Sequence, residues 1–160
     1  MKIIKFVAMM LMAATVSFGM TACGDDDDET KKIINGIEDG EVDASAVYTV
    51  KKDKLEIEYT CYAYTSVETA TFDGEKCTSW KTVQTYSTAA LADKAWEVVS
   101  ELFEEDEIGL KDCYSKDGKS ITIDQGKIGG LSYETYETMK LYFDQRVAGY
   151  EKAGVKVTRK

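Results

Sequence analysis

The sequence predicts an α+β domain of two layers, in which one antiparallel sheet of about five to six strands carries two helices packed on one face. Residues 46–86 predict strands, because apolar and polar side chains alternate there with period two. Residues 87–107 and 132–154 predict helices, because their apolar side chains recur three and four positions apart. Short polar turns between the strands indicate antiparallel neighbours, since only such strands can be joined by two residues.

The first two strands, "AVYTV" and "KLEIEYTCYAYT", are predicted to pair across a polar Lys-Asp turn. A two-residue turn there places Val50 opposite Leu55 and Tyr48 opposite Ile57, so that both pairs fall on one face. The same face continues along the second strand through Tyr59, Cys61 and Ala63. This face is therefore the predicted core of the sheet.

Two more hairpins are predicted at Asp-Gly pairs, where glycine takes a positive φ freely. Asp73-Gly74 joins "VETATF" to "KCTSWKTVQTY", and Asp117-Gly118 joins "LKDCYS" to "SITID". The segment "VKVTR" near the C-terminus adds a predicted final strand.

Both helices have a capping residue and an apolar stripe. The first is capped by Ser87 or Thr88, and its stripe consists of Leu91, Ala95, Val98 and Leu102. The second is capped by Ser132 and ends at Gly154, and its stripe consists of Tyr136, Met139, Phe143, Val147 and Tyr150.

Residues 1–22 have the features of a secretory signal peptide. Lys2 and Lys5 form a positive n-region, and residues 6–18 form an apolar run that is too short for a bilayer span of roughly 20 residues. The segment Met20-Thr21-Ala22-Cys23 resembles the bacterial lipobox, in which the cysteine sulfur receives diacylglycerol and becomes the first mature residue. The resemblance implies lipid attachment, palmitate included, at Cys23. A soluble secreted protein cut near Ala22, or an uncut membrane anchor, are the alternatives.

An acidic run follows the cysteine directly, at Asp25, Asp26, Asp27, Asp28 and Glu29. Such a run in its simplest role keeps a tether solvated. It also resembles the acidic export signal of surface lipoproteins from the Bacteroidetes, and this resemblance implies an outer-membrane location that faces the cell exterior. A periplasm-facing location is the alternative. The chain thus divides into a signal peptide (1–22), a lipidated acidic tether (23–44) and a single α+β domain (45–160).

The domain itself resembles small Bacteroidetes lipoproteins of uncharacterised function. The likeness lies in "TATFDGEKCTSW", "LADKAWE" and "DGKSITID" followed by "LSYETYETMK", and it covers most of residues 46–150. These motifs are turns and caps, so the resemblance implies no catalytic residue.

Composition excludes several functions. Removal of residues 1–22 takes away two lysines and no acid, so the formal net charge goes from −9 to −11, which excludes nucleic acid as a partner. The chain has no histidine, so it lacks Ser-His and Cys-His nucleophile pairs and histidine-ligated zinc. We therefore expect a non-enzymatic protein without a cofactor, while a hydrolase that uses two carboxylates stays open.

The three remaining cysteines are expected to be buried thiols. Cys61 and Cys77 fall on strands two apart, about 9 to 10 Å from each other in the expected register, which exceeds the reach of a disulfide. A disulfide that involves Cys113 is one alternative, and a reactive or metal-binding thiol is another. The acidic cluster at residues 101–107 lacks the alternating spacing of a calcium loop, so we expect no metal there.

An aromatic group is the candidate ligand surface. In a regular register, Tyr62, Tyr64, Trp80 and Tyr86 lie on the face opposite the core, where their rings offer stacking area to a glycan or protein. In the alternative, a bulge near Thr78 turns Trp80 and Tyr86 inward and makes them structural.

The function predicted is a membrane-anchored surface module that binds a glycan or protein ligand without catalysis. The alternative is a structural or accessory subunit of an envelope complex. An exposed aromatic face favours the first function, and a long unpaired edge strand favours the second.

Overall fold

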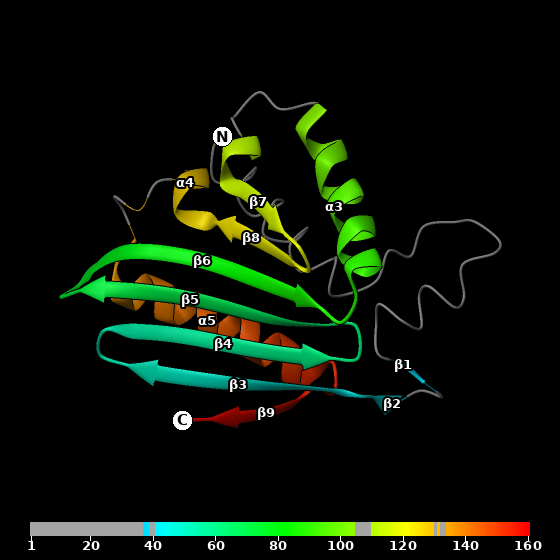
Figure 1. The fold of residues 1–160 in the computed structure, drawn as a ribbon. Coiled ribbons are helices and arrows are strands. Elements are labelled where there is room, and N and C mark those ends of the chain that lie inside the picture. Colours follow the sequence, from blue (N-terminus) through cyan, green and yellow to red (C-terminus); the bar gives the residue numbers. More distant parts are fainter. Residues whose placement is uncertain (1–36, 39–40, 105–109, 130, 132–133) are drawn as a thin grey trace.

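The computed structural model describes residues 37–38, 41–104, 110–129, 131 and 134–160. A two-stranded sheet pairs β1 (Ile37–Glu38) with β2 (Glu41–Val42). The main sheet has seven strands in the order β7-β8-β6-β5-β4-β3-β9 (Figure 1). Their bounds are β3 (Ala44–Lys51), β4 (Lys54–Cys61), β5 (Tyr64–Asp73), β6 (Lys76–Tyr86), β7 (Tyr114–Asp117), β8 (Ser120–Asp124) and β9 (Lys156–Arg159). The helices are α3 (Ala89–Glu104), α4 (Gln125–Gly129) and α5 (Tyr136–Lys152), with a 3₁₀ turn η1 (Leu110–Cys113).

The predicted α+β class is confirmed, and the hairpin turns lie where they were expected, but Leu110–Cys113, predicted as the start of a strand, is a 3₁₀ turn, and β7 begins only at Tyr114. Val50 pairs with Leu55 and Tyr48 pairs with Ile57 across the first turn. At the two Asp-Gly hairpins, Gly74 and Gly118 have φ values of 61° and 55°, which other residues rarely adopt.

The expectation of an antiparallel sheet of five to six strands is wrong in detail, because the sheet is mixed and has seven. β9 lies parallel to β3, with Ser45 opposite Lys156. α5 supplies the crossover that a parallel pair requires: it begins beside Lys76, which bridges to Thr135, and crosses behind the sheet. The chain is thereby returned to the start of β3 rather than to its end.

α5 ends in a Schellman motif that directs the chain into β9. Gly154 has a φ of 86°, and the Val155 N–H donates to the carbonyl of Tyr150 at 3.0 Å. The N-cap of α5 is Thr135, in a capping box with Thr138. The predicted cap Ser132 lies outside the described residues.

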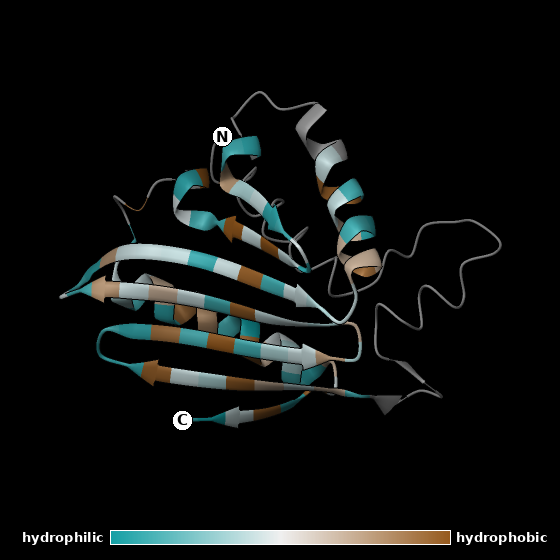
Figure 2. Cartoon of the chain, in the orientation of Figure 1, coloured by the Kyte–Doolittle hydropathy of each residue, from teal (hydrophilic) through white to brown (hydrophobic). Residues whose placement is uncertain are grey.

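The apolar stripe of α5 forms the centre of the core, as predicted. Its four buried residues are Met139, Phe143, Val147 and Tyr150. Phe143 stacks on Tyr48 with ring centroids 6.4 Å apart, and Tyr150 stacks on Tyr59 at 5.1 Å. Hydrophobic positions alternate with polar ones along the strands that α5 covers, so one sheet face meets the helix (Figure 2).

The expectation of two helices packed on one face of the sheet is right in outline, since residues of α3 and α5 belong to one core, but α4 is an additional helix and the two long helices cover different parts of the sheet. α5 lies across the middle of the sheet, whereas α3 packs against β6, β8 and η1 at the β7-β8 end (Figure 1). Thr88 caps α3 as predicted, by accepting the Leu91 N–H at 3.2 Å. Val98 is not on the buried stripe, since it is 41% exposed, and Ala92 is fully buried instead.

Candidate functional site

The predicted lipid attachment at Cys23 and the export signal Asp25–Glu29 lie outside the described residues. The short β1-β2 sheet falls within the predicted tether, and the main domain begins at Ala44. No helix in the described part of the chain combines the length and hydropathy needed to cross a membrane.

The predicted aromatic ligand surface is wrong, because three of its four members are buried. Tyr64, Trp80 and Tyr86 are 3%, 1% and 6% exposed, and of the four only Tyr62 is exposed, at 73%. The bulge alternative is confirmed for β6: its pairing with β5 shifts register so that Thr78 is the extra residue.

The inward position of Tyr64 has a different cause. β4 ends at Cys61 and the chain turns at Tyr62 and Ala63, so Tyr64 begins the next strand on the core face. Its ring lies 5.8 Å from that of Tyr59 and 5.5 Å from that of Tyr86, between centroids. These rings therefore form a packed aromatic cluster and offer no platform to a ligand.

The cysteines are buried, as expected. Cys61 and Cys77 are free thiols, and Cys113 at the end of η1 is bridged to neither of them. Cys61 lies near the β4-β5 turn, and Cys77 lies near the β5-β6 turn. The two thiols are therefore at opposite ends of the sheet, and the expected distance of 9 to 10 Å between them does not hold. Burial raises the pKa of Cys77, so this thiol is a poor nucleophile at neutral pH.

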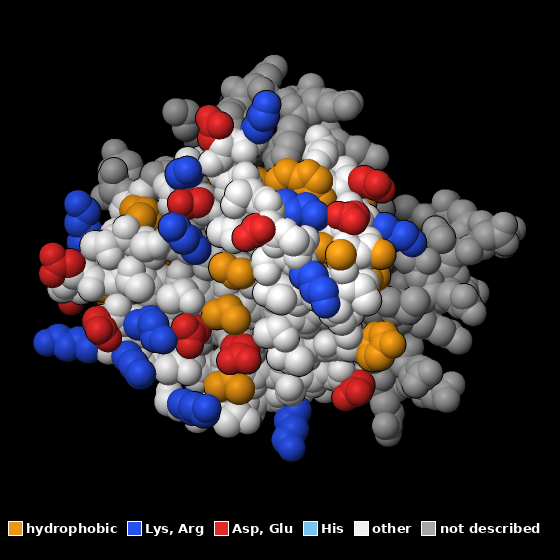
Figure 3. Space-filling model, viewed as in Figure 1, with side chains coloured by type: hydrophobic (Ala, Val, Ile, Leu, Met, Phe, Trp, Pro, Cys, Tyr) orange, Lys and Arg blue, Asp and Glu red, His pale blue; other side chains and the backbone are white. Residues whose placement is uncertain are grey.

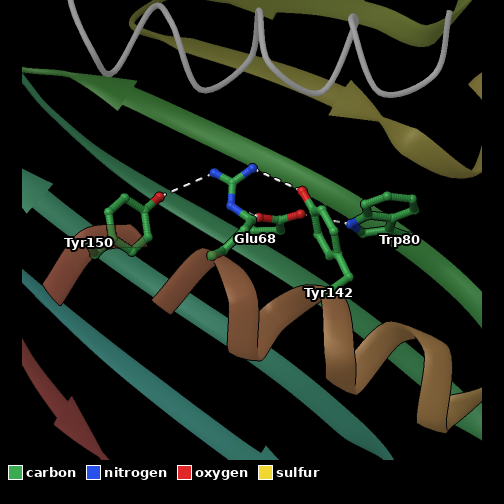
Figure 4. Close-up of polar contacts among 5 residues, drawn as sticks. Glu68, Trp80, Tyr142 and Tyr150 are labelled. Carbon is green, nitrogen blue, oxygen red and sulfur yellow. Dashed lines mark hydrogen bonds and ion pairs between the residues drawn. The ribbon is translucent and has the colours of Figure 1, made fainter. Parts of the chain in front are cut away.

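A buried polar network joins the sheet to α5 (Figure 4). Glu68 on β5 is 3% exposed and accepts a hydrogen bond from the Trp80 indole nitrogen at 2.9 Å. Its other carboxylate oxygen lies 3.3 Å from Nε of Arg146 on α5. Arg146 also donates to the hydroxyls of Tyr142 at 2.9 Å and Tyr150 at 3.1 Å. The guanidinium is thus held between a carboxylate and two phenols.

The electrostatics of this network favour the charged form of Arg146. Burial by itself lowers the pKa of Arg146, but the Glu68 carboxylate and the two tyrosines outweigh it and raise the pKa well above its usual value. Burial, followed by the Glu68 charge, raises the pKa of Tyr142. Both Glu68 oxygens already have donors, so the carboxylate is poorly placed for acid-base chemistry, and the network fixes α5 on the sheet.

The sheet face opposite α5 carries polar side chains that pair with one another. Thr71 and Thr78 are 3.2 Å apart between hydroxyl oxygens, and Thr69 donates to Glu56 at 3.2 Å. The face seen in Figure 3 accordingly shows scattered hydrophobic side chains among polar ones. This face has the character of a solvated surface.

Both edge strands of the main sheet are short and charged. β7 and β9 each have four residues, and they carry Lys116, Lys156 and Arg159. Short strands with lysines are typical of edges that do not pair with another chain. The long unpaired edge that favours an envelope subunit is therefore not found among the described strands.

A cavity that is broadly open to solvent lies between α3, η1 and β7. Its volume is about 620 Å³, within the usual range for small-molecule sites. The described residues that line it are Trp96 and Ser100 from α3, Lys111 from η1, and Tyr114, Ser115 and Lys116 from β7. In Figure 3 a hydrophobic patch lies beside charged side chains in the region between α3 and β7. We call this feature the α3–β7 cavity.

The α3–β7 cavity combines ring surfaces with hydrogen-bond donors. Burial, with a contribution from Cys113, raises the pKa of Tyr114, so its phenol stays protonated at neutral pH. Lys116 forms an ion pair with Asp93 of α3 at 2.7 Å, which ties the helix to the strand. The described residues hold no cluster of three metal-ligating side chains, and the acidic stretch 105–109 lies outside them.

Sequence reasoning missed this site because its members come from three separate elements. The position of Trp96 could have been predicted from its spacing, because it follows Ala92 by four residues and lies on the helix face that points away from Val98. No sequence pattern placed Lys111 and Lys116 in a site, since lysines on a turn and an edge strand are ordinarily solvated.

Comparison of the chain with protein-family models, with curated proteins and with solved structures finds no match.

Proposed function

We propose that this protein is a lipid-anchored surface module that binds a carbohydrate in the α3–β7 cavity without catalysis. The observation that carries the proposal is the lining of the cavity, which sets Trp96 and Tyr114 beside Ser100 and Ser115. Aromatic rings stack against the apolar faces of sugars, and hydroxyl and ammonium groups hydrogen-bond to their hydroxyls.

Two further features support a binding role over the alternatives. Glu68, the carboxylate buried in the described core, is occupied by Trp80 and Arg146, so it is not placed to work with a second acid in hydrolysis. The short, lysine-bearing edge strands give an envelope partner little backbone to pair with. The aromatic surface that the sequence predicts is thereby replaced by a cavity at one end of the sheet.

The cavity is tested by filling it. We expect Ser115→Phe to weaken the binding of oligosaccharides by about tenfold or more, because the new ring takes the space of the ligand. Ser45→Phe on β3 is the matched control, since Ser45 is also an exposed strand serine but lies outside the cavity. Calorimetry with cello-, xylo- and galacturono-oligosaccharides measures the affinities. Absence of binding to every series, or an equal loss in both variants, contradicts the proposal.

The anchor and its orientation are tested in cells. We expect labelled palmitate to enter the wild type and not Cys23→Ala, because the thiol is the acceptor. Replacement of Asp25–Asp28 by alanine is expected to leave the lipid in place but to retain the domain inside the outer membrane. Protease added to intact cells should then digest the wild type and spare the alanine variant. Equal palmitate labelling contradicts the anchor, and a protected wild type contradicts surface exposure.

A further inference from the structure

We propose that the sugar bound in the α3–β7 cavity is acidic and that Lys111 and Lys116 hold its carboxylate, a step that rests on the proposed function and names the class of its ligand. The described lining contains two lysines and no acid. The chain as a whole has the opposite balance of charge, with 29 acidic and 20 basic residues.

The two lysines come from separate elements and meet at one cavity. Lys111 lies on η1 and is exposed, whereas Lys116 lies on β7 with 22% of its side chain exposed. Asp112, Cys113, Tyr114 and Ser115 lie between them in the sequence, and Tyr114 and Ser115 line the same cavity. A ligand that contacts the Tyr114 ring is therefore in the same cavity as both cations.

The ion pair with Asp93 is compatible with this role. Lys116 has three N–H donors, and a carboxylate 2.7 Å away occupies one direction. The Asp93 side chain is 62% exposed, so its carboxylate is largely solvated. Asp93 thus orients Lys116 and leaves further donor directions for a second acceptor.

The lining also explains why the anion should be part of a sugar. Trp96 and Tyr114 supply ring surfaces for stacking, and the Ser100 hydroxyl, which donates to the Trp96 carbonyl at 2.7 Å, still accepts hydrogen bonds. A uronic acid offers the matching set of an apolar ring face, hydroxyl donors and a carboxylate. A simple inorganic anion leaves the aromatic part of the cavity unused.

Two trimers with the same sugar backbone and different charge test this inference. The galacturonic acid trimer and its methyl ester have the same sugars and linkages, and only the acid presents carboxylates. We expect the acid to bind at least about tenfold more tightly than the ester, as charge-assisted hydrogen bonds predict. We expect this preference to be lost in the double variant Lys111→Met with Lys116→Met.

Two control variants separate a local effect from a general one. Lys94→Met removes an exposed lysine of α3 outside the cavity and should keep the preference. Lys116→Arg retains the positive charge and should keep most of the preference for the acid.

Equal affinities for acid and ester in the wild type overturn the inference but leave carbohydrate binding intact. Retention of the preference in the double methionine variant overturns the assignment to these lysines, and failure of both trimers and of the neutral series overturns the proposed function itself.

Discussion

Glu68→Ala is expected to destabilise the folded domain by about 3–5 kcal/mol, because it leaves the Arg146 guanidinium, whose side chain is 19% exposed, without its carboxylate. Arg146→Ala is expected to have an effect of similar size, since it leaves the Glu68 carboxyl group, which is 3% exposed, without its cation. The double variant Glu68→Met with Arg146→Met should be more stable than either single alanine variant, because neither charge is then buried alone.

Denaturant unfolding of the three variants measures these differences. Arg159→Ala is the matched control, since it breaks an ion pair with Glu151 whose side chains are 54% and 46% exposed. Its expected cost is at most about 1 kcal/mol. A Glu68→Ala cost no larger than that of Arg159→Ala contradicts the view that this network fixes α5 to the sheet.

Phe143→Ala is expected to cost about 3–5 kcal/mol of unfolding free energy, because it opens a cavity at the centre of the core. Phe143 is fully buried between the sheet and α5 and contacts the rings of Tyr48 and Tyr142. Leu141→Ala on the same helix is the control, since Leu141 is 61% exposed and its removal should change stability by about 0.5 kcal/mol or less. Similar effects at both positions contradict the described orientation of α5.

Local patterns predicted most of this fold. The turn before Lys54 set the pairing of Val50 with Leu55, and the alternation along β4 then determined which side chains face the core. The stripe on α5 was equally clear, because its large apolar residues recur over four turns. These features depend on residues near one another in sequence, where spacing and geometry are directly linked.

The errors come from features that spacing alone does not determine. One extra residue at Thr78 reversed the facing of Trp80 and Tyr86, and a two-residue turn reversed that of Tyr64. The parallel pairing of β9 with β3 depends on where α5 ends, which is a matter of tertiary packing.

Part of the buried network could have been inferred from the sequence. Glu68 has the same parity as Ala70 and Phe72 on β5, and a lone acid on a core face calls for a buried partner. Its partner, Arg146, was not identifiable, because the contact joins residues 78 positions apart on different elements. The α3–β7 cavity had the same difficulty, since it forms only when α3, η1 and β7 come together.

The indole signals of the two tryptophans give the most direct test of the central claim that the α3–β7 cavity is the binding site. Trp80 is sealed in the core and bonded to Glu68, whereas Trp96 lines the cavity. In ¹⁵N-resolved NMR spectra, assigned with Trp96→Phe, titration with the galacturonic acid trimer is expected to shift the Trp96 indole signal and to leave that of Trp80 in place. Binding that leaves the Trp96 signal unchanged, with shifts instead along the exposed sheet face at Val67 and Val83, contradicts the account.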